Sequence, residues 1–350
     1  MADIIVASIS LKDRTVGYYN LKTGEKIPII RNLKSKSDIN AIIEARSIVL
    51  CESIYPSDLN SSQVSLVIVV PDDYRYGQRL TLYNFCKTQF DISWHRIISE
   101  TRALALSAEP QEDRGAICFS YNNKSRILAY CCAEIDDDVY QIKSTSFIKK
   151  DDEDIKSVFI DKIRQSLRSV LRLDLYSEAY FSPDVLFMED IRKHLETIGI
   201  VKMRTIAGET LHSNMLRWVS GMLRKTSGAK KLLLDAIPYE IETAHEIAIE
   251  KDDPMIISHL EKLTTVMDKQ EIADISLVVN YPDQNHSELI GVYSAKINSV
   301  KKAETDIIEI ETYCDAGGII SVNALMENNG KTYHYHLTGP KQGFGKYEDK

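Results

Sequence analysis

Few residues of this chain form a recognisable catalytic or metal-binding motif. The six cysteines are scattered and include no CxxC pair, so their spacing predicts no zinc site. Several lie in apolar strand-like runs, where a buried free thiol is the expected state. His334 and His336 share one face of a predicted strand, but no third metal ligand accompanies them. Segment 339–346 is glycine-rich, yet no Ser or Thr and no helix follow its last lysine, so it is not interpreted as a phosphate-binding loop.

Two acidic runs, 134–138 and 151–154, are the other candidates for ligand chemistry, as cation sites. Runs of like charge are usually solvated turns, and both are interpreted in that way. The sequence therefore predicts no metal and no cofactor on the basis of motifs alone.

The bulk composition limits the function classes. The chain has 350 residues with a net charge of -8, which is long enough for two domains and disfavours general nucleic-acid binding. No direct DNA binding is expected. The start of the chain lacks the basic segment of a secretory signal, and no apolar run approaches the roughly 20 residues of a membrane span. These features predict a cytoplasmic protein with no membrane association.

The first two-thirds of the chain predicts one unit twice: three strands, a helix, a strand and a helix. Val64–Val70 is a continuous β-branched run, typical of a strand covered on both faces. Hydrophobic residues at helical spacing predict amphipathic helices over 154–173 and Leu211–Leu223. The other predicted strands are Ile4–Ile9, Thr15–Tyr19, Lys26–Ile30, Ala116–Phe119, Arg126–Cys132, Val139–Phe147 and Val185–Met188. The other predicted helices are Asp38–Arg46, Gly77–Gln89, Thr101–Ala108 and Ile191–Thr197.

After Gly228 the pattern changes to strands alone. Ile308-Glu309-Ile310-Glu311 alternates, as a half-solvated antiparallel strand does, and a separate all-β sandwich is expected. Its predicted strands are Ile272–Val279, Leu289–Ile297, Ile307–Tyr313, Ile319–Ala324 and Lys331–Leu337. The predicted organisation is a duplicated α/β domain at 1–228, a linker at 229–238, a β domain at 239–338 and a flexible tail at 339–350.

Three segments resemble the seventy-kilodalton heat-shock chaperones of the DnaK type. The first carries Val70-Pro71, Gln78-Arg79 and Arg96–Ala105, similar to the family's "TVPAYFNDAQR … RIINEPTAAA". The second is Leu232–Pro238, similar to the interdomain "LLLDVTP". The third carries Leu289–Tyr293, Ile308–Ile310 and Cys314–Ala324, similar to "LLGxFxL … PQIEVTF … DANGILNVSA". The resemblance implies an actin-like ATPase-type core followed by a substrate-binding β domain.

In that family, glycine-rich hairpins hold ATP phosphates and nearby acidic residues hold magnesium. At most of the corresponding positions this chain has neither the glycines nor the acidic residues. Ser8 stands in place of an aspartate in the first hairpin, and Ser10 lies where glycine is expected. Ser120 replaces the second aspartate, and Asn122, Asn123 and Lys124 replace three glycines. The bulky side chains of both hairpins are expected to fill the phosphate space.

The adenosine-side loop of the family aligns with Val185–Ile191, where Met188 and Glu189 stand in place of glycines. Of the acidic set only Glu100 remains. The short spacings also imply that much of the ATPase domain is missing, and the chain stops soon after the β domain, so no helical lid is expected. The resemblance therefore implies a pseudo-ATPase that is not an enzyme and needs no cofactor.

The linker residues Leu232, Leu233, Leu234 and Asp235 carry a further expectation. In the family this linker alternates between two positions as nucleotide changes. Without nucleotide no differential binding energy drives such a switch. The linker is therefore expected to stay in one state, with Leu232 and Leu234 packed.

The resulting functional hypothesis is a non-catalytic chaperone-like scaffold or co-chaperone that binds a protein partner. The atypical lidless family members that act with a J-domain protein at the ribosome are the nearest comparison. A J-domain co-chaperone, the ribosome or another large assembly is thus the candidate partner. The alternative is an ATP-independent holdase that binds unfolded peptides through the β domain.

Overall fold

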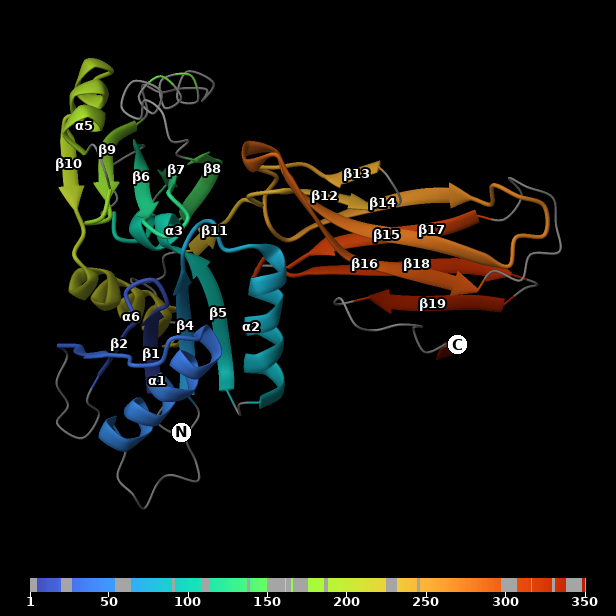
Figure 1. Cartoon of the computed structure of the whole chain (residues 1–350), viewed down its shortest axis with the longest axis horizontal. Coiled ribbons are helices and arrows are strands. Elements are labelled where there is room, and N and C mark those ends of the chain that lie inside the picture. Colours follow the sequence, from blue (N-terminus) through green and yellow to red (C-terminus); the bar gives the residue numbers. More distant parts are fainter. Residues whose placement is uncertain are drawn as a thin grey trace. The chain divides into compact units, whose positions relative to one another are not determined.

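The computed structural model in Figure 1 divides the chain into two compact units, Met1–Asp235 and Ala236–Lys350. Each is described by itself. The described residues are 5–19, 27–53, 64–89, 92–108, 114–136, 139–149, 161, 165, 176–185, 188–224, 232–243, 246–296, 307–315, 317–328, 331–337 and 348–349.

The first half of the first unit is a five-stranded mixed sheet in the order β3-β2-β1-β4-β5. β1, β2 and β3 form an antiparallel meander, and β4 and β5 continue parallel to β1. Its strands are β1 (Ile5–Ser10), β2 (Thr15–Tyr18), β3 (Ile29–Asn32), β4 (Val64–Val70) and β5 (Ile92–Ser99). Its helices are α1 (Asp38–Ser53), α2 (Tyr76–Gln89) and α3 (Glu100–Ala105).

The second half repeats this arrangement in the order β10-β9-β6-β7-β8, with β11 added beside β8. β6, β7 and β8 form the antiparallel meander, and β9 and β10 run parallel to β6. Its strands are β6 (Arg114–Asn122), β7 (Ile127–Asp136), β8 (Val139–Lys149), β9 (Tyr176–Phe181), β10 (Lys202–Thr205) and β11 (Leu232–Leu234). Its helices are α5 (Met188–Thr197) and α6 (Gly208–Arg224). The expected duplication is therefore present in strand order and direction.

The two hairpin turns that begin the halves also correspond in backbone conformation. The β1–β2 turn ends at Arg14 with φ 54°, and the β6–β7 turn ends at Arg126 with φ 57°. A left-handed backbone is uncommon for a residue other than glycine. Its recurrence at the same place in both hairpins is a second sign of duplication.

Each half gives its last helix to the other half. α3, which follows β5, contacts β6 and β7, and α6, which follows β10, contacts β1 and β2. Figure 1 shows α6 lying against the first sheet. The buried Trp218 of α6 has the guanidinium of Arg96 of β5 5.5 Å from its ring centre. The halves are consequently joined through these exchanged helices.

Continuous apolar character explains the position of β4. Leu66, Ile68 and Val70 pack with α1 and α2 in the core of the first half. Because successive side chains of a strand point to opposite faces, Val67 and Val69 lie on the other face of the sheet, and both are buried. α3 and α6 contact β4, so the strand is covered on both sides as its sequence predicts.

The second unit consists of two antiparallel sheets, ordered β13-β12-β15-β16 and β14-β17-β18-β19-β20. Figure 1 shows the strands of both sheets running roughly along one direction. Thr243 of one sheet and Thr312 of the other share a buried hydrogen bond of 2.9 Å. The strands are β12 (Glu240–Thr243), β13 (Glu246–Ile249), β14 (Ile257–Thr264), β15 (Ile272–Tyr281), β16 (His286–Lys296), β17 (Ile307–Cys314), β18 (Ile320–Asn328), β19 (Lys331–Leu337) and β20 (Glu348–Asp349), with a 3-10 turn at Pro282–Gln284.

Sequence patterns identified most of these elements but missed several. β5, β10, β11, β12, β13 and β14 were not expected, because short or mixed-polarity strands give a weak period-two signal. The strand expected at Val185–Met188 is wrong: the strand is Tyr176–Phe181, and Met188 already opens α5. The helix expected at 154–173 lies outside the described residues apart from positions 161 and 165, which are helical. Of the tail expected to be flexible, Glu348 and Asp349 pair with β19, and the rest lies outside the described part.

Two further expectations concern cysteines and membrane spans. All six cysteines are free, and all but Cys51 are buried, as their apolar surroundings predicted. In the part of the chain that the structure describes, the helices are too short or too polar to cross a bilayer.

Candidate functional site

A buried lysine lies between two carboxylates where the halves of the first unit meet. Lys12, in the β1–β2 turn, places its Nζ 3.0 Å from both carboxylate oxygens of Glu100. The same Nζ is 3.2 Å from Oδ2 of Asp184, which follows β9. The Lys12 side chain is 11% exposed and that of Glu100 is 6% exposed. One ammonium thus ties the first hairpin, the start of α3 and the turn after β9 together.

Burial and neighbouring charges shift the proton affinity of both partners. Burial raises the pKa of Glu100, the ammonium of Lys12 opposes this rise, and the carboxylates of Asp72 and Asp13 add to it. Burial alone would lower the pKa of Lys12, but the carboxylates of Glu100, Asp184 and Asp13 outweigh it, and the pKa lies above its usual value. The Lys12 ammonium is therefore charged throughout the neutral range.

A second buried cluster is centred on Asp72, just after β4. The Thr101 backbone N–H donates to its Oδ2 at 3.0 Å, and the Thr101 hydroxyl donates to Oδ1. Ser120 of β6 donates from Oγ to Oδ2 at 2.6 Å. Nη1 of Arg102 lies 3.4 Å from Oδ1. A buried carboxylate is stable only with such donors, and here they come from both halves.

Arg102 extends this cluster to the end of β11. Its Nε donates to Oδ1 of Asp235 at 3.0 Å, and its side chain is 2% exposed. Burial alone would lower the pKa of Arg102, but Asp235 and other neighbours raise it above its ordinary value, so the guanidinium stays charged. The short β11 strand is thereby tied at its carboxyl end to the α3 helix.

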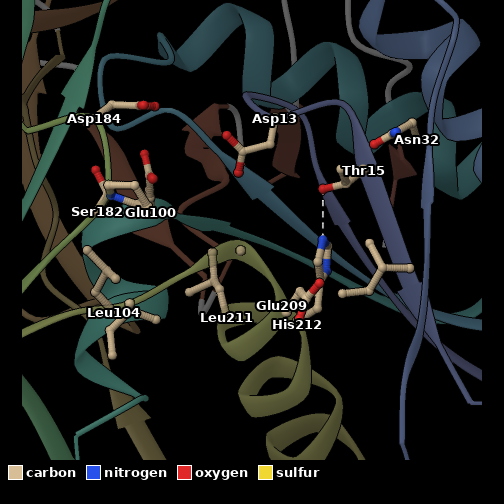
Figure 2. Close-up of a pocket in the computed structure, with 14 residues that line it drawn as sticks. Asp13, Thr15, Asn32, Glu100, Leu104, Ser182, Asp184, Glu209, Leu211 and His212 are labelled. Atoms are coloured by element: carbon tan, nitrogen blue, oxygen red, sulfur yellow. Dashed lines mark hydrogen bonds between the residues drawn. The ribbon is translucent and has the colours of Figure 1, made fainter.

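A cavity of about 340 Å³ lies beside the Lys12 cluster (Figure 2). Four carboxylates line it, and Figure 2 shows Glu100 and Asp184 on one side with Asp13 between them and Thr15. Among the residues that the structure describes, its lining includes no Lys or Arg. The four lining carboxylates belong to Asp13, Glu100, Asp184 and Glu209.

His212 of α6 forms part of the same cavity. Its Nε2 is 2.8 Å from the hydroxyl of Thr15, a contact drawn in Figure 2. Burial lowers the pKa of His212 to about 4, while Asp13 opposes this change. The imidazole is therefore neutral at pH 7. A Cβ added at Gly17 would lie 2.8 Å from His212 carbons, so the strand needs glycine where it passes α6.

The predicted hairpin residues are partly brought together. Ser8 is buried in β1 instead of lying in the turn. Ser10 closes the first turn, donating from Oγ to Asp13 at 2.9 Å. Ser120 joins the Asp72 cluster, and the amide of Asn122 donates to Oδ1 of Asp73 at 2.8 Å.

The structure places the side chains of the two hairpins differently. Asn123 and Lys124 are exposed in the β6–β7 turn and fill nothing between the halves. Lys12 of the other hairpin is the side chain that enters the buried region. The difference lies in the partners, because Glu100 and Asp184 hold the Lys12 ammonium, whereas Lys124 is exposed.

The placement of the third loop is also wrong. Met188 and Glu189 form the first turn of α5 and do not follow the strand directly. The turn after β9 begins at Ser182, and its Pro183 and Asp184 line the cavity. The alignment was displaced because Val185–Phe187 is more apolar than the true strand, which contains Ser177 and Glu178.

The linker leucines are buried in the opposite pattern to the one expected. β11 pairs in parallel with β8, with Leu233 opposite Tyr140. Leu233 is 4% exposed, whereas Leu232 and Leu234 are 43% and 37% exposed. Successive side chains of a strand point to opposite faces, so either Leu233 or its two neighbours can be buried on one face, and in this structure it is Leu233.

Sequence reasoning missed Asp72, Arg102 and Asp184, and did not foresee the role of Lys12. One signal was available for Asp72: it follows Pro71 at the carboxyl end of a fully buried parallel strand, where polar side chains of α/β folds commonly gather. Nothing local marks Arg102, since its partners lie 30 and 133 residues away in sequence.

Comparison of the sequence with models of known families and with curated proteins gives no match. Among the described residues, no group of three or more His, Cys, Asp or Glu is arranged to hold a metal ion.

Proposed function

We propose that the chain is a pseudo-ATPase related to the seventy-kilodalton chaperones, and that it acts as a non-catalytic protein-binding scaffold. The observation that carries the proposal is the position of Lys12. It lies in the hairpin where the resemblance places ATP phosphates, and it is ion-paired with Glu100, the one retained acidic residue. An internal ammonium there supplies the positive charge that a metal ion would otherwise bring.

The duplicated halves support an actin-like core as the ancestry of the first unit. Both sheets have the same order and strand directions, and both begin with a hairpin facing the junction of the halves. Fold alone does not imply activity, so the argument for lost ATP binding rests on the site.

Charge supports the loss of ATP binding. The cavity has carboxylates from four residues and no Lys or Arg in its lining, so it repels a triphosphate. The nearby Lys12 is already neutralised by two carboxylates and is not available as a phosphate ligand. Ser120, which replaces the second family aspartate, is instead a structural donor to Asp72.

The linker geometry fits a protein that does not cycle between states. β11 is hydrogen-bonded to β8, and its Asp235 is held by the buried Arg102. With no ligand to bind one linker state better than another, this arrangement persists.

Titration calorimetry with Mg-ATP tests the pseudo-ATPase proposal. No saturable heat is expected up to millimolar nucleotide, and unfolding temperature should not rise with ATP, because a ligand that binds the folded state stabilises it. Saturable binding in the micromolar range would refute this part of the proposal. An ATP-binding chaperone of the same family serves as the positive control.

Affinity purification from the native cell tests the scaffold role. A stable protein partner is expected, with a J-domain protein or the ribosome as the first candidates, and ribosome co-sedimentation follows. Recovery of the chain alone in stoichiometric amounts would contradict the scaffold role.

A second candidate function is an ATP-independent holdase, favoured by an exposed apolar row on the second unit. Across the four-stranded sheet, Glu242 of β12 pairs with Ile247 on one side and with Val278 on the other, and Val278 pairs with Leu289. Three of the four residues in this row are therefore apolar. Ile247 is 53% exposed and Leu289 is 62% exposed. Anisotropy of a labelled extended apolar peptide tests this function, with Leu289→Ser expected to weaken binding. Absence of binding at high micromolar concentration excludes it.

A further inference from the structure

The cavity of the first unit has an excess of negative charge that its own residues do not neutralise. Lys12 pairs with Glu100 and Asp184, which leaves the lining carboxylates of Asp13 and Glu209 without a basic residue in the cavity lining. Glu209 is exposed at the first turn of α6, and Asp13 is exposed in the first hairpin. A cation entering from solvent would meet these rim carboxylates first.

A buried polar atom points to a ligand independently of the carboxylates. Ser182 lines the cavity and is 1% exposed. Its Oγ has no hydrogen-bond partner among the described residues. An unsatisfied buried hydroxyl costs about 1–3 kcal/mol, so such atoms are normally paired. A ligand donor inside the cavity would satisfy it.

The rest of the lining is apolar. Leu104 of α3, Leu211 of α6 and Ile206 are buried and face the cavity from both halves. Figure 2 shows Leu104 and Leu211 on the side opposite Asp13 and Asp184. The cavity therefore combines an acidic rim with an apolar wall. A volume of about 340 Å³ is at the lower end of small-ligand sites, which suits a single side chain or small amine.

We propose that this cavity binds an alkylguanidinium or alkylammonium group, with the cation at the rim carboxylates of Asp13 and Glu209 and a donor on Ser182 Oγ. The apolar stem would pack on Leu104 and Leu211. The inference goes beyond the proposed scaffold function, since it does not depend on the second unit or on any partner already named. The same chemistry is offered by an arginine or lysine side chain of a protein and by a free diamine.

Two other ligand classes fit the lining less well. A phosphate-bearing ligand would meet four carboxylates and no Lys or Arg in the lining. A metal ion would need converging ligands, and the described residues contain no such group of His, Cys, Asp or Glu. An organic cation needs only a diffuse negative rim and one or two acceptors.

Titration calorimetry of the full chain tests the proposal with N-acetyl-arginine amide, putrescine and N-acetyl-citrulline amide. The citrulline compound is nearly isosteric with the arginine compound but uncharged. The arginine compound or putrescine is expected to bind, and the citrulline compound is not. Tighter binding of the arginine compound assigns the cavity to a protein side chain, and tighter binding of putrescine assigns it to a free diamine. Binding of neither cation, or equal binding of the citrulline compound, overturns the proposal.

Variants connect the binding to the cavity. Glu209→Gln should weaken the cation about threefold and Glu209→Lys about tenfold, as expected for removal and reversal of one rim charge. The same changes at Glu196, exposed on α5, should have no effect. Ser182→Val, which removes the hydroxyl and fills space, should weaken binding about tenfold. Unchanged affinity in both Glu209→Lys and Ser182→Val, with unfolding temperature preserved, would place the cation elsewhere and refute the assignment.

Discussion

At the scale of single residues, the first unit holds its buried charges in paired clusters. Lys12, Arg102 and Asp72 are all nearly buried, and each meets partners from distant parts of the chain. Burial of a charge is costly unless it is paired and hydrogen-bonded, so these residues depend on one another. This dependence makes the clusters sensitive to single substitutions.

Arg102→Leu should be strongly destabilising. The substitution removes the cation that pairs with the carboxylates of Asp72 and Asp235. Breaking a buried ion pair in this way typically lowers the free energy of unfolding by about 3–5 kcal/mol. The control is Arg31→Leu, because Arg31 and its partner Glu52 are 48% and 37% exposed and such pairs contribute at most about 1 kcal/mol. Urea unfolding measures both changes. Equal losses would show that the Arg102 cluster is not the stabilising element inferred from its burial.

Placing an aspartate at position 120, as the proposed resemblance to the chaperone family would have it, should not produce ATP binding. Ser120→Asp brings a second carboxylate to a site where Oγ now lies 2.6 Å from Asp72 Oδ2. Two close carboxylates raise the pKa of one of them, so the variant should be least stable at high pH and recover as pH falls. Ser120→Ala is the matched control and should lose about 1–3 kcal/mol without this pH dependence. Unfolding at pH 8 and pH 5, together with Mg-ATP calorimetry, distinguishes the outcomes.

His212 should make the first unit less stable in mild acid. Its pKa is lowered from 6.5 to about 4 by burial, so between these values the unfolded chain binds a proton that the folded chain does not. Stability is fully present above pH 6.5 and falls as pH decreases, by up to about 1.4 kcal/mol per pH unit. His212→Gln removes this contribution. The difference in unfolding free energy between the two proteins should therefore change from pH 7.5 to pH 5, and a constant difference would contradict the assignment. The pKa of Glu100 is raised, so Glu100 makes the folded state more stable as pH falls. This contribution is the same in both proteins and cancels in the difference between them.

At the scale of elements, sequence patterns identified what periodicity and long apolar runs encode. β4, α2, α6 and the strands β15 to β19 of the second unit follow from their residues, because burial on one or both faces requires those patterns. Short strands with polar residues, such as β10 with its sequence KMRT, carry no such signal. Their position is set by pairing with β9 and not by their own residues.

The candidate site was predictable only in part for a similar reason. The hairpins and Ser120 could be located because they adjoin strands that the sequence predicts, and Glu100 was located through the resemblance of Arg96–Ala105 to the chaperone family. The Arg102–Asp235 pair could not, because it joins segments that come together only when β11 docks beside β8. The register of β11 shows the same limit. Its three residues are all leucine, so only the pairing with β8 decides whether Leu233 or its two neighbours are buried.

The register of β11 gives a direct test at this scale. Leu233→Ala removes a side chain that is 4% exposed and should cost about 2–5 kcal/mol, whereas Leu232→Ala and Leu234→Ala should each change stability by about 0.5 kcal/mol or less. Denaturant unfolding measures all three variants, which are controls for one another. Larger effects at Leu232 and Leu234 than at Leu233 would instead support the register expected from the sequence.

At the scale of the whole molecule, the first unit is a duplication whose halves exchange their last helices. α3 covers β6 and β7 of the other sheet, and α6 covers β1 and β2. Across the same junction the Lys12 cluster adds an ion pair with Asp184, and the Asp72 cluster adds a hydrogen bond from Ser120. If either half unfolded alone, the other would lose a helix and leave charges unpaired. The two halves should therefore unfold together.

Leu66→Ala tests this cooperativity by a core change confined to β4. Leu66 is fully buried in the core of the first half, and its truncation should cost about 3 kcal/mol, which corresponds to roughly hundredfold faster exchange of amides that open by global unfolding. The acceleration should appear in β6 and β9 of the second half as well as in β1. Amides of β15 and β17 in the second unit should be unaffected, because that unit has its own core. Ile43→Ala is the control, since Ile43 is 41% exposed on α1. Acceleration limited to the first half would mean that the exchanged helices do not couple the two halves.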